Sequence, residues 1–260
     1  TLVVMQSPTA TSGPLGLSGT VDVFGMLTLG STAGTGSQGS LLSSTDPTAN
    51  AYGLVMHPGS RLEIGNWEAT PTTNTMINRY GDTTPLTLNG AMLRVLGPNS
   101  GSPTLASPEI IGDLNIAGGS TIGLYRRTGN GAAALTVASL NRVDFGTLTL
   151  ETTDPNYLGV ANGTANNLRF RVSGATQPTV TNGIVAPWMI SWRNSNFLDY
   201  TPADGFRNLT VWEHNTGAFP VGLTAGTAKV NIWGAEAFLR DDPTVEIIAF
   251  TATQIPGIDS

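Results

Sequence analysis

Cysteine is absent from this chain of 260 residues, and lysine occurs only once, as Lys229. The first absence excludes disulfides, thiolate metal sites and cysteine nucleophiles. The shortage of lysine leaves a formal net charge of −6 and only scattered arginines. Nucleic-acid binding needs a basic face that neutralises phosphates, so the sequence excludes this class of function.

Charged residues make up only 12% of the chain, about half the share usual in a globular domain. Long apolar runs are also missing, and none approaches the ~20 residues that a membrane-spanning helix needs. The chain opens at Thr1 with a short apolar stretch and without the charged region of a signal peptide. We therefore expect either a removed leader or a segment of something longer.

The chain contains 32 glycines and 16 prolines, and its polar residues are mostly Thr, Ser and Asn. Such a composition favours short strands joined by tight turns. It disfavours long helices, because Gly, Thr and Asn are weak helix formers.

One phrase recurs along the first two thirds of the sequence: a short alternating apolar run, then Gly or Asn-Gly, then another alternating run. Residues 20–30, 86–97 and 114–124 are examples. Alternation with period 2 is typical of half-buried strands. Phrases begin near residues 62, 86, 114, 135 and 168, and steps of roughly 20–33 residues suit the coils of a solenoid.

The pattern predicts an all-β fold, a right-handed parallel β-helix of about seven or eight coils with Asn and Gly at its corners. A β-sandwich or jelly roll, also built from short strands and Gly-rich turns, remains the alternative. Two long polar stretches, residues 31–51 and 66–85, are expected to project from the rod.

The composition changes near residue 180, beyond which four of the five tryptophans lie. We expect a β-solenoid repeat region over residues 1–178 and an aromatic-rich β region over residues 179–260. The second region would form a cap or the final coils, because exposed strand edges need cover. Alternatively, tryptophans could bind glycan or a partner protein; the candidates are Trp67, Trp188, Trp192 and Trp212.

The opening of the chain carries a family resemblance. Residues 1–4 read TLVV, residues 14–23 read PLGLSGTVDV and residues 25–30 read GMLTLG. This resembles the autotransporter-associated β-strand repeat, and residues 183–188 (GIVAPW) with 197–200 (FLDY) add to the likeness. The resemblance implies a secreted or surface-displayed bacterial protein with a β-helical passenger region and no assigned catalytic residues.

The sequence departs from the family phrase at residues 24–26, where Phe-Gly-Met replaces more polar residues. This would place two large apolar side chains at a corner of the solenoid. The departure indicates a contact to another chain.

The sequence contains few groups of residues that could form a catalytic or metal-binding site. The acidic residues are spread thinly, unlike the clustered carboxylates of β-helical polysaccharide-degrading enzymes. The adjacent pair Asp241–Asp242 is interpreted as a solvated turn, with Asp199 or Asp204 as further ligands if the pair bound Ca²⁺. His57 and His214 each precede a turn. We expect no enzyme activity and no cofactor, and the metal question stays open.

The leading hypothesis is a structural or adhesive segment of a bacterial extracellular surface, forming a rod, fibre or coat. Its expected partners are copies of itself, neighbouring repeats of a longer chain, or surface polysaccharide. We expect no nucleic-acid partner and no membrane span in this segment. A glycan-binding module and, third, a polysaccharide-degrading enzyme are the alternatives. The terminal apolar residues are the candidates for assembly: Leu2, Val3, Val4, Met5, Val245, Ile247, Ile248 and Phe250.

Overall fold

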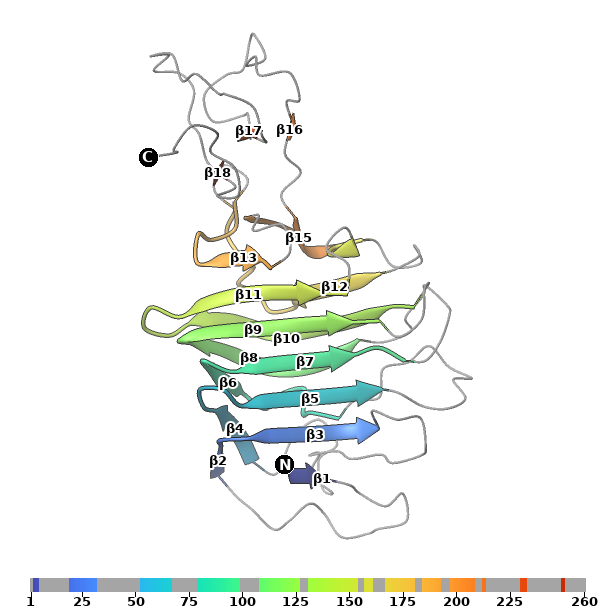
Figure 1. Ribbon diagram of the computed structural model, residues 1–260, viewed down its shortest axis with the longest axis vertical. Helices are drawn as coiled ribbons and strands as arrows, with labels where there is room; N and C mark the ends of the chain where they lie inside the picture. Colours follow the sequence, from blue (N-terminus) through green and yellow to red (C-terminus); the bar gives the residue numbers. More distant parts are fainter. Residues whose placement is uncertain are drawn as a thin grey trace, which may run out of the picture.

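The computed structural model of the chain describes residues 2–4, 19–31, 52–66, 79–98, 108–126, 131–153, 157–160, 167–180, 184–192, 197–208, 212–213, 230–232 and 249–250. These residues form strands that stack along one axis (Figure 1).

Two parallel sheets make up the body of the molecule. The first sheet contains, in spatial order, β1 (Leu2–Val4), β3 (Met26–Ser31), β5 (Arg61–Asn66), β7 (Met92–Leu96), β9 (Gly119–Tyr125), β11 (Thr147–Thr152) and β13 (Met189–Ser191). The second contains β2 (Gly19–Val23), β4 (Tyr52–Met56), β6 (Leu86–Asn89), β8 (Glu109–Ala117), β10 (Ala133–Arg142) and β12 (Leu168–Val172).

Each coil contributes one strand to the second sheet and the next strand to the first, so that β2–β3, β4–β5 and the later pairs stack upon one another. All neighbouring strands within the two sheets run parallel. The predicted parallel β-helix is therefore confirmed. The sandwich alternative is wrong, because its sheets would pair neighbouring strands antiparallel.

Columns of aliphatic side chains run through the interior between the sheets. In the first sheet one column joins, in strict register, Leu27, Leu62, Leu93, Ile122 and Leu150. Each of these side chains is at most 3% exposed. The alternating burial of β7 and β8 matches the period-2 pattern of the sequence, so the alternation directly places one residue in two in the core.

The recurring phrase of the sequence corresponds to a strand of the second sheet, a short corner and a strand of the first. The predicted step from residue 62 to 86 is wrong as a coil, because Leu62 lies in β5 and its partner in the next coil is Leu93. The strand missing from that prediction is β4, whose sequence YGLVM interrupts strict alternation with glycine and adjacent apolar residues.

The corners between paired strands are tight where glycine occupies them. Gly118 alone separates β8 from β9 and has a φ of 59°. Gly90 has a φ of 64° at the same place one coil earlier. A Cβ on Gly118 would come within 2.9 Å of the Gly90 nitrogen. Both the left-handed backbone and the close stacking of the corners therefore require glycine.

An antiparallel hairpin of β14 (Leu198–Thr201) and β15 (Gly205–Asn208) follows the stacked coils. Its Phe206 stacks on Phe170 of β12 with ring centroids 4.9 Å apart, and Tyr200 meets Phe206 edge-on at 4.8 Å. All three rings are buried. The three rings thus pack against the aliphatic core, and the cap over residues 179–260 stays a prediction.

Residues 79–85 correct a second expectation. The sequence placed them in a projecting loop, but Arg79 and Tyr80 are fully buried. Tyr80 donates from its hydroxyl to the carbonyl oxygen of Pro85 at 2.8 Å. The predicted loop over residues 31–51 lies almost entirely outside the described residues.

Beyond the hairpin, a three-stranded parallel sheet joins β16 (Trp212–Glu213), β17 (Val230–Ile232) and β18 (Ala249–Phe250). β13 pairs in parallel with β11 and so extends the first sheet past residue 178. The division at residue 178 stays a prediction.

Replacement of Leu93 by alanine tests the aliphatic column. We expect Leu93→Ala to lower the free energy of unfolding by about 2–5 kcal/mol, because it opens a cavity in the centre of the stack. Thr121→Ala is the matched control, since Thr121 lies on the outer side of the adjacent strand β9 and is half-buried. Urea denaturation followed by circular dichroism measures both, and equal losses would contradict the packing described.

Candidate functional site

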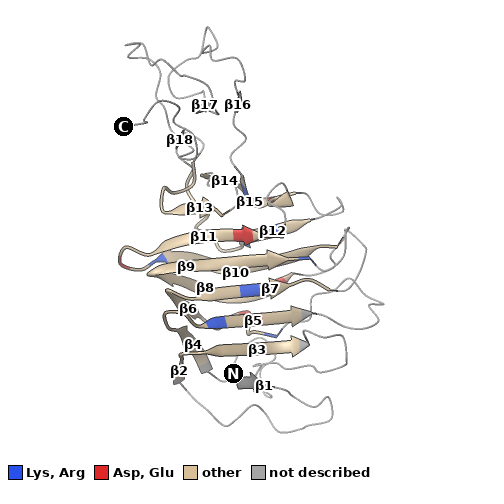
Figure 2. Cartoon of the chain, in the orientation of Figure 1, with Lys and Arg blue, Asp and Glu red and all other residues tan. Residues whose placement is uncertain are grey.

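A polar network covers the outer side of the first sheet. The guanidinium of Arg94 on β7 contacts the Glu63 carboxylate on β5 at 3.0 Å and lies over the Tyr125 ring at 4.5 Å from its centroid. Burial, with the side-chain hydrogen bond to Glu151, raises the pKa of Tyr125. Figure 2 shows the charged residues of β5, β7 and β11 along this side. These groups bind one another across successive coils, which stabilises the stack.

The outer side of the second sheet carries uncharged hydrogen bonds. Asn141 donates from its amide to Asn115 Oδ1 at 3.1 Å, and Asn115 donates to Thr87 Oγ1 at 3.4 Å. These residues occupy matching register positions on β10, β8 and β6. These side chains thus form hydrogen bonds between the same strands, and in the same register, as the backbone.

The corner between β2 and β3 presents an aromatic side chain to solvent. Phe24 is 75% exposed and stacks on the His57 ring, with centroids 4.1 Å apart and 9° between the planes. His57 Nε2 donates to Asp22 Oδ1 at 2.7 Å. The expectation that His57 sits at a turn is correct, since Pro58 and Gly59 form that turn. Phe145 occupies the corner between β10 and β11 and is 89% exposed.

A carboxyl group is buried inside the coil at the start of β8. Glu109 is fully buried, and its Oε1 accepts hydrogen bonds from the backbone N–H groups of Arg79 at 3.0 Å and Tyr80 at 2.9 Å. Burial raises the pKa of Glu109 to about 8, against the lowering effect of these bonds and of Arg79. The carboxyl group thereby anchors residues 79–85 to the next coil.

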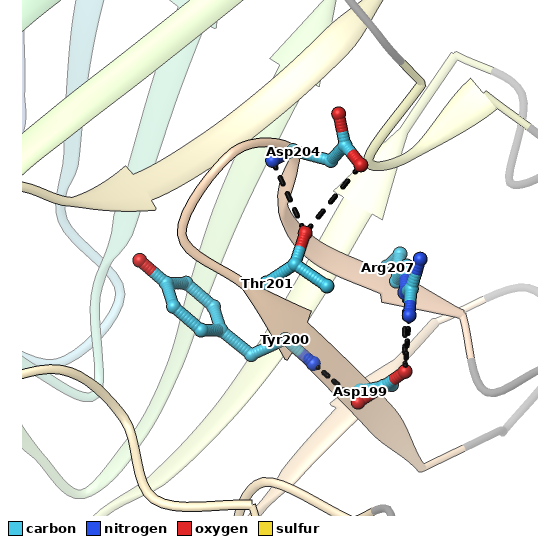
Figure 3. A network of polar contacts seen from close by, with 5 residues as sticks. All are labelled: Asp199, Tyr200, Thr201, Asp204 and Arg207. Atoms are coloured by element: carbon cyan, nitrogen blue, oxygen red, sulfur yellow. Dashed lines mark hydrogen bonds and ion pairs between the residues drawn. The ribbon is translucent and has the colours of Figure 1, made fainter.

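The hairpin holds the two described aspartates that the sequence offered for Ca²⁺. The Asp199 carboxylate accepts two hydrogen bonds from the Arg207 guanidinium, at 2.8 and 3.1 Å (Figure 3). The Thr201 hydroxyl accepts a hydrogen bond from the backbone N–H of Asp204 and donates one to its carboxylate. Asp241 and Asp242 lie outside the described residues. Within the described ranges, no three histidine, aspartate or glutamate side chains gather where they could hold a metal ion.

The tryptophans proposed as glycan or partner contacts differ in their exposure to solvent. Trp192, just after β13, is 56% exposed. Trp188 is partly buried, packs against the core and faces the Arg142 guanidinium at 5.7 Å. Trp212 belongs to β16, and Trp67 lies outside the described residues. Trp192 is thus the one of the four that the described part of the chain shows exposed.

The assembly candidates fall at strands of different sheets. Residues 2–4 form β1, the first strand of the first sheet, and pair with β3. Phe250 pairs with Ile232 in the small parallel sheet. Met5, Val245, Ile247 and Ile248 lie outside the described residues.

No protein-family model, curated protein or solved structure matches this chain. Over the described residues, no helix has both the length and the hydropathy to cross a membrane. The sequence reasoning missed the exposed Phe145 and the buried Glu109. The single available signal for Phe145 was the corner position between two alternating runs.

The buried carboxyl predicts a pH dependence of stability. The folded-state pKa of Glu109, about 8, exceeds its ordinary value of 4.5. The folded state therefore binds the proton more tightly, and this contribution to stability is complete below pH 4.5 and is lost as the pH rises to 8.

We expect Glu109→Gln to remove this loss, since the amide keeps the acceptor oxygen but cannot ionise. The free energy of unfolding of the variant relative to the wild type should rise by about 3–5 kcal/mol between pH 5 and pH 9. Denaturation at both pH values measures the change. A difference independent of pH would show that Glu109 does not ionise in this range.

Proposed function

We propose that this chain is a structural segment of a bacterial extracellular surface protein, a stiff rod that contributes to a fibre, sheath or coat. The supporting observation is the unbroken parallel register that links β1 to β13 in one sheet and β2 to β12 in the other. In such a stack each strand is hydrogen-bonded to the coil before and the coil after, so the rod resists bending and local opening.

The polar side chains support a role without a reaction centre. Three of the described carboxylates contact a basic side chain of the same chain. Glu63 contacts Arg94, Asp199 contacts Arg207, and Asp22 contacts His57. Networks of this kind hold coils together and fix register. A low content of charge also suits dense packing of copies, because like-charge repulsion is small. The placement outside the cell follows from the resemblance of the opening residues to the autotransporter-associated repeat.

Strand β1 is the candidate edge for end-to-end growth. It pairs with β3 on one side, and a parallel strand from another segment could extend the sheet on the other. Such an addition would continue the same hydrogen-bond ladder.

Removal of residues 1–6 tests this growth. A truncated copy mixed in equal amount with intact protein should shorten end-to-end polymers, because it lacks β1 and ends the ladder. Electron microscopy of negatively stained samples measures polymer length, with the addition of an equal amount of intact protein as the control. Unchanged length distributions would contradict the role of β1.

A second candidate function, glycan binding, is favoured by the exposure of Trp192. An exposed indole ring can stack on a sugar ring. Titration with bacterial surface polysaccharide should then shift the tryptophan fluorescence of the wild type. The fluorescence of the Trp192→Ala variant should not shift. A shift of equal size in both proteins would remove Trp192 from the binding site.

A further inference from the structure

One edge of the solenoid consists of the short corners that join the two sheets. We call the corners at residues 24–25, 57–60, 90–91, 118 and 143–146 the corner edge. They follow one another along the rod on the left side of Figure 1. Successive corners are spaced by about 4.8 Å, the distance between neighbouring strands.

The corner edge carries three of the six large apolar side chains that are exposed in the described part of the chain. Phe24 is 75% exposed, Phe145 is 89% exposed and Val143 is 36% exposed. Phe24 lies in the first corner and Val143 and Phe145 lie in the fifth, so the edge offers a partner two separate apolar contact points.

The ring of Phe24 and the backbone of the Phe145 corner are held in fixed positions. Phe24 stacks on His57, which is itself bonded to Asp22. The corner of Phe145 is closed by a hydrogen bond from the Gly146 N–H to the Val143 carbonyl oxygen, at 3.0 Å. In that corner Asp144 has a φ of 52°, a left-handed conformation that costs free energy for a residue other than glycine. Rigid presentation lowers the entropy lost on binding.

The lengths of the corners differ in a way that fits a second copy. The second and fifth corners, residues 57–60 and 143–146, are long, whereas the corner at residue 118 is a single glycine. A two-fold axis through the third corner, residues 90–91, would place the fifth corner of one copy against the first corner of the other. It would also place the long second corner against the single-residue fourth corner, so that a projection meets a recess.

The charges agree with the same arrangement. Arg142 at the end of β10 is exposed, and Asp22 near the end of β2 has a side chain 60% exposed. The two-fold axis keeps equivalent sheets on the same side and so brings Arg142 of one copy opposite Asp22 of the other. A parallel arrangement would instead set each corner against its own copy, so that long corners meet long corners and the short corners are held apart.

We propose that the corner edge binds a second copy of this chain, with the two rods antiparallel and Phe145 of each packed on the Phe24–His57 pair of the other. The interface is isologous, so every contact occurs twice. It joins rods side by side and is independent of the end-to-end pairing of β1 proposed above.

Cysteine crosslinking tests the arrangement, because the chain contains no cysteine of its own. Gly25→Cys is sterically free, since a Cβ there meets nothing within 4 Å, and Thr147 is exposed at the start of β11. The antiparallel contact brings position 25 of one copy next to position 147 of the other. A mixture of Gly25→Cys and Thr147→Cys proteins, treated with a short bis-maleimide, should form the mixed dimer at least about tenfold faster than either protein alone forms a dimer. Like dimers formed as fast as mixed dimers would overturn the proposal.

Sedimentation velocity over a series of concentrations gives the second readout. Phe24→Ser and Phe145→Ser should each weaken self-association by at least about tenfold, because each removes an aromatic contact that occurs twice in the interface. Trp192→Ser is the matched control, an exposed aromatic outside the corner edge, and should leave the association unchanged. The copy lacking residues 1–6 should still pair, which separates this interface from the β1 edge. A wild type that stays monomeric at all concentrations, or equal weakening by all three serine variants, would overturn the proposal.

Discussion

The structure depends on parallel pairing in register between successive coils. Because side chains alternate along a strand, a fixed register places the same face of every coil inward, and Leu27, Leu62 and Leu93 form one column. A shift by one residue would turn that column outward. The outer polar pairs, such as Glu63 with Arg94, exist only because the same register aligns them. Core and surface are thus two consequences of one pairing scheme.

Sequence reasoning predicted the elements that follow this alternation. The runs around Leu86, Leu114 and Leu148 are strands, and Asn89–Gly90 is the point where β6 ends and a corner begins. Sequence reasoning failed where the local pattern of apolar and polar residues differs from that of a half-buried strand or an exposed loop. β4 breaks the alternation. In the polar-looking stretch before Leu86, Arg79 and Tyr80 are buried, and their backbone N–H groups donate to the Glu109 carboxyl, 30 and 29 residues further along the chain.

The candidate sites could not be read from the sequence for a related reason. Phe24 and His57 are separated by one full coil, as are Glu63 and Arg94. Coil length varies along the chain, from 25 residues between Leu2 and Leu27 to 41 between Leu148 and Met189. Without the register, no spacing rule tells which side chain stacks on which. The departure at Phe24 could be noticed, but its ring partner could not be named.

The same geometry explains where a chain of this kind can acquire binding surfaces. Residues within the sheets are constrained on both sides by neighbouring strands, so their outer side chains satisfy one another. The corners lie outside the strand ladders, and their length can change by several residues without disturbing the columns, as the single Gly118 and the four residues 143–146 show. Exposed aromatics at Phe24 and Phe145 therefore interrupt neither the core nor the sheets. Variation in corner length then becomes the means by which a uniform rod obtains a shape that another copy can match.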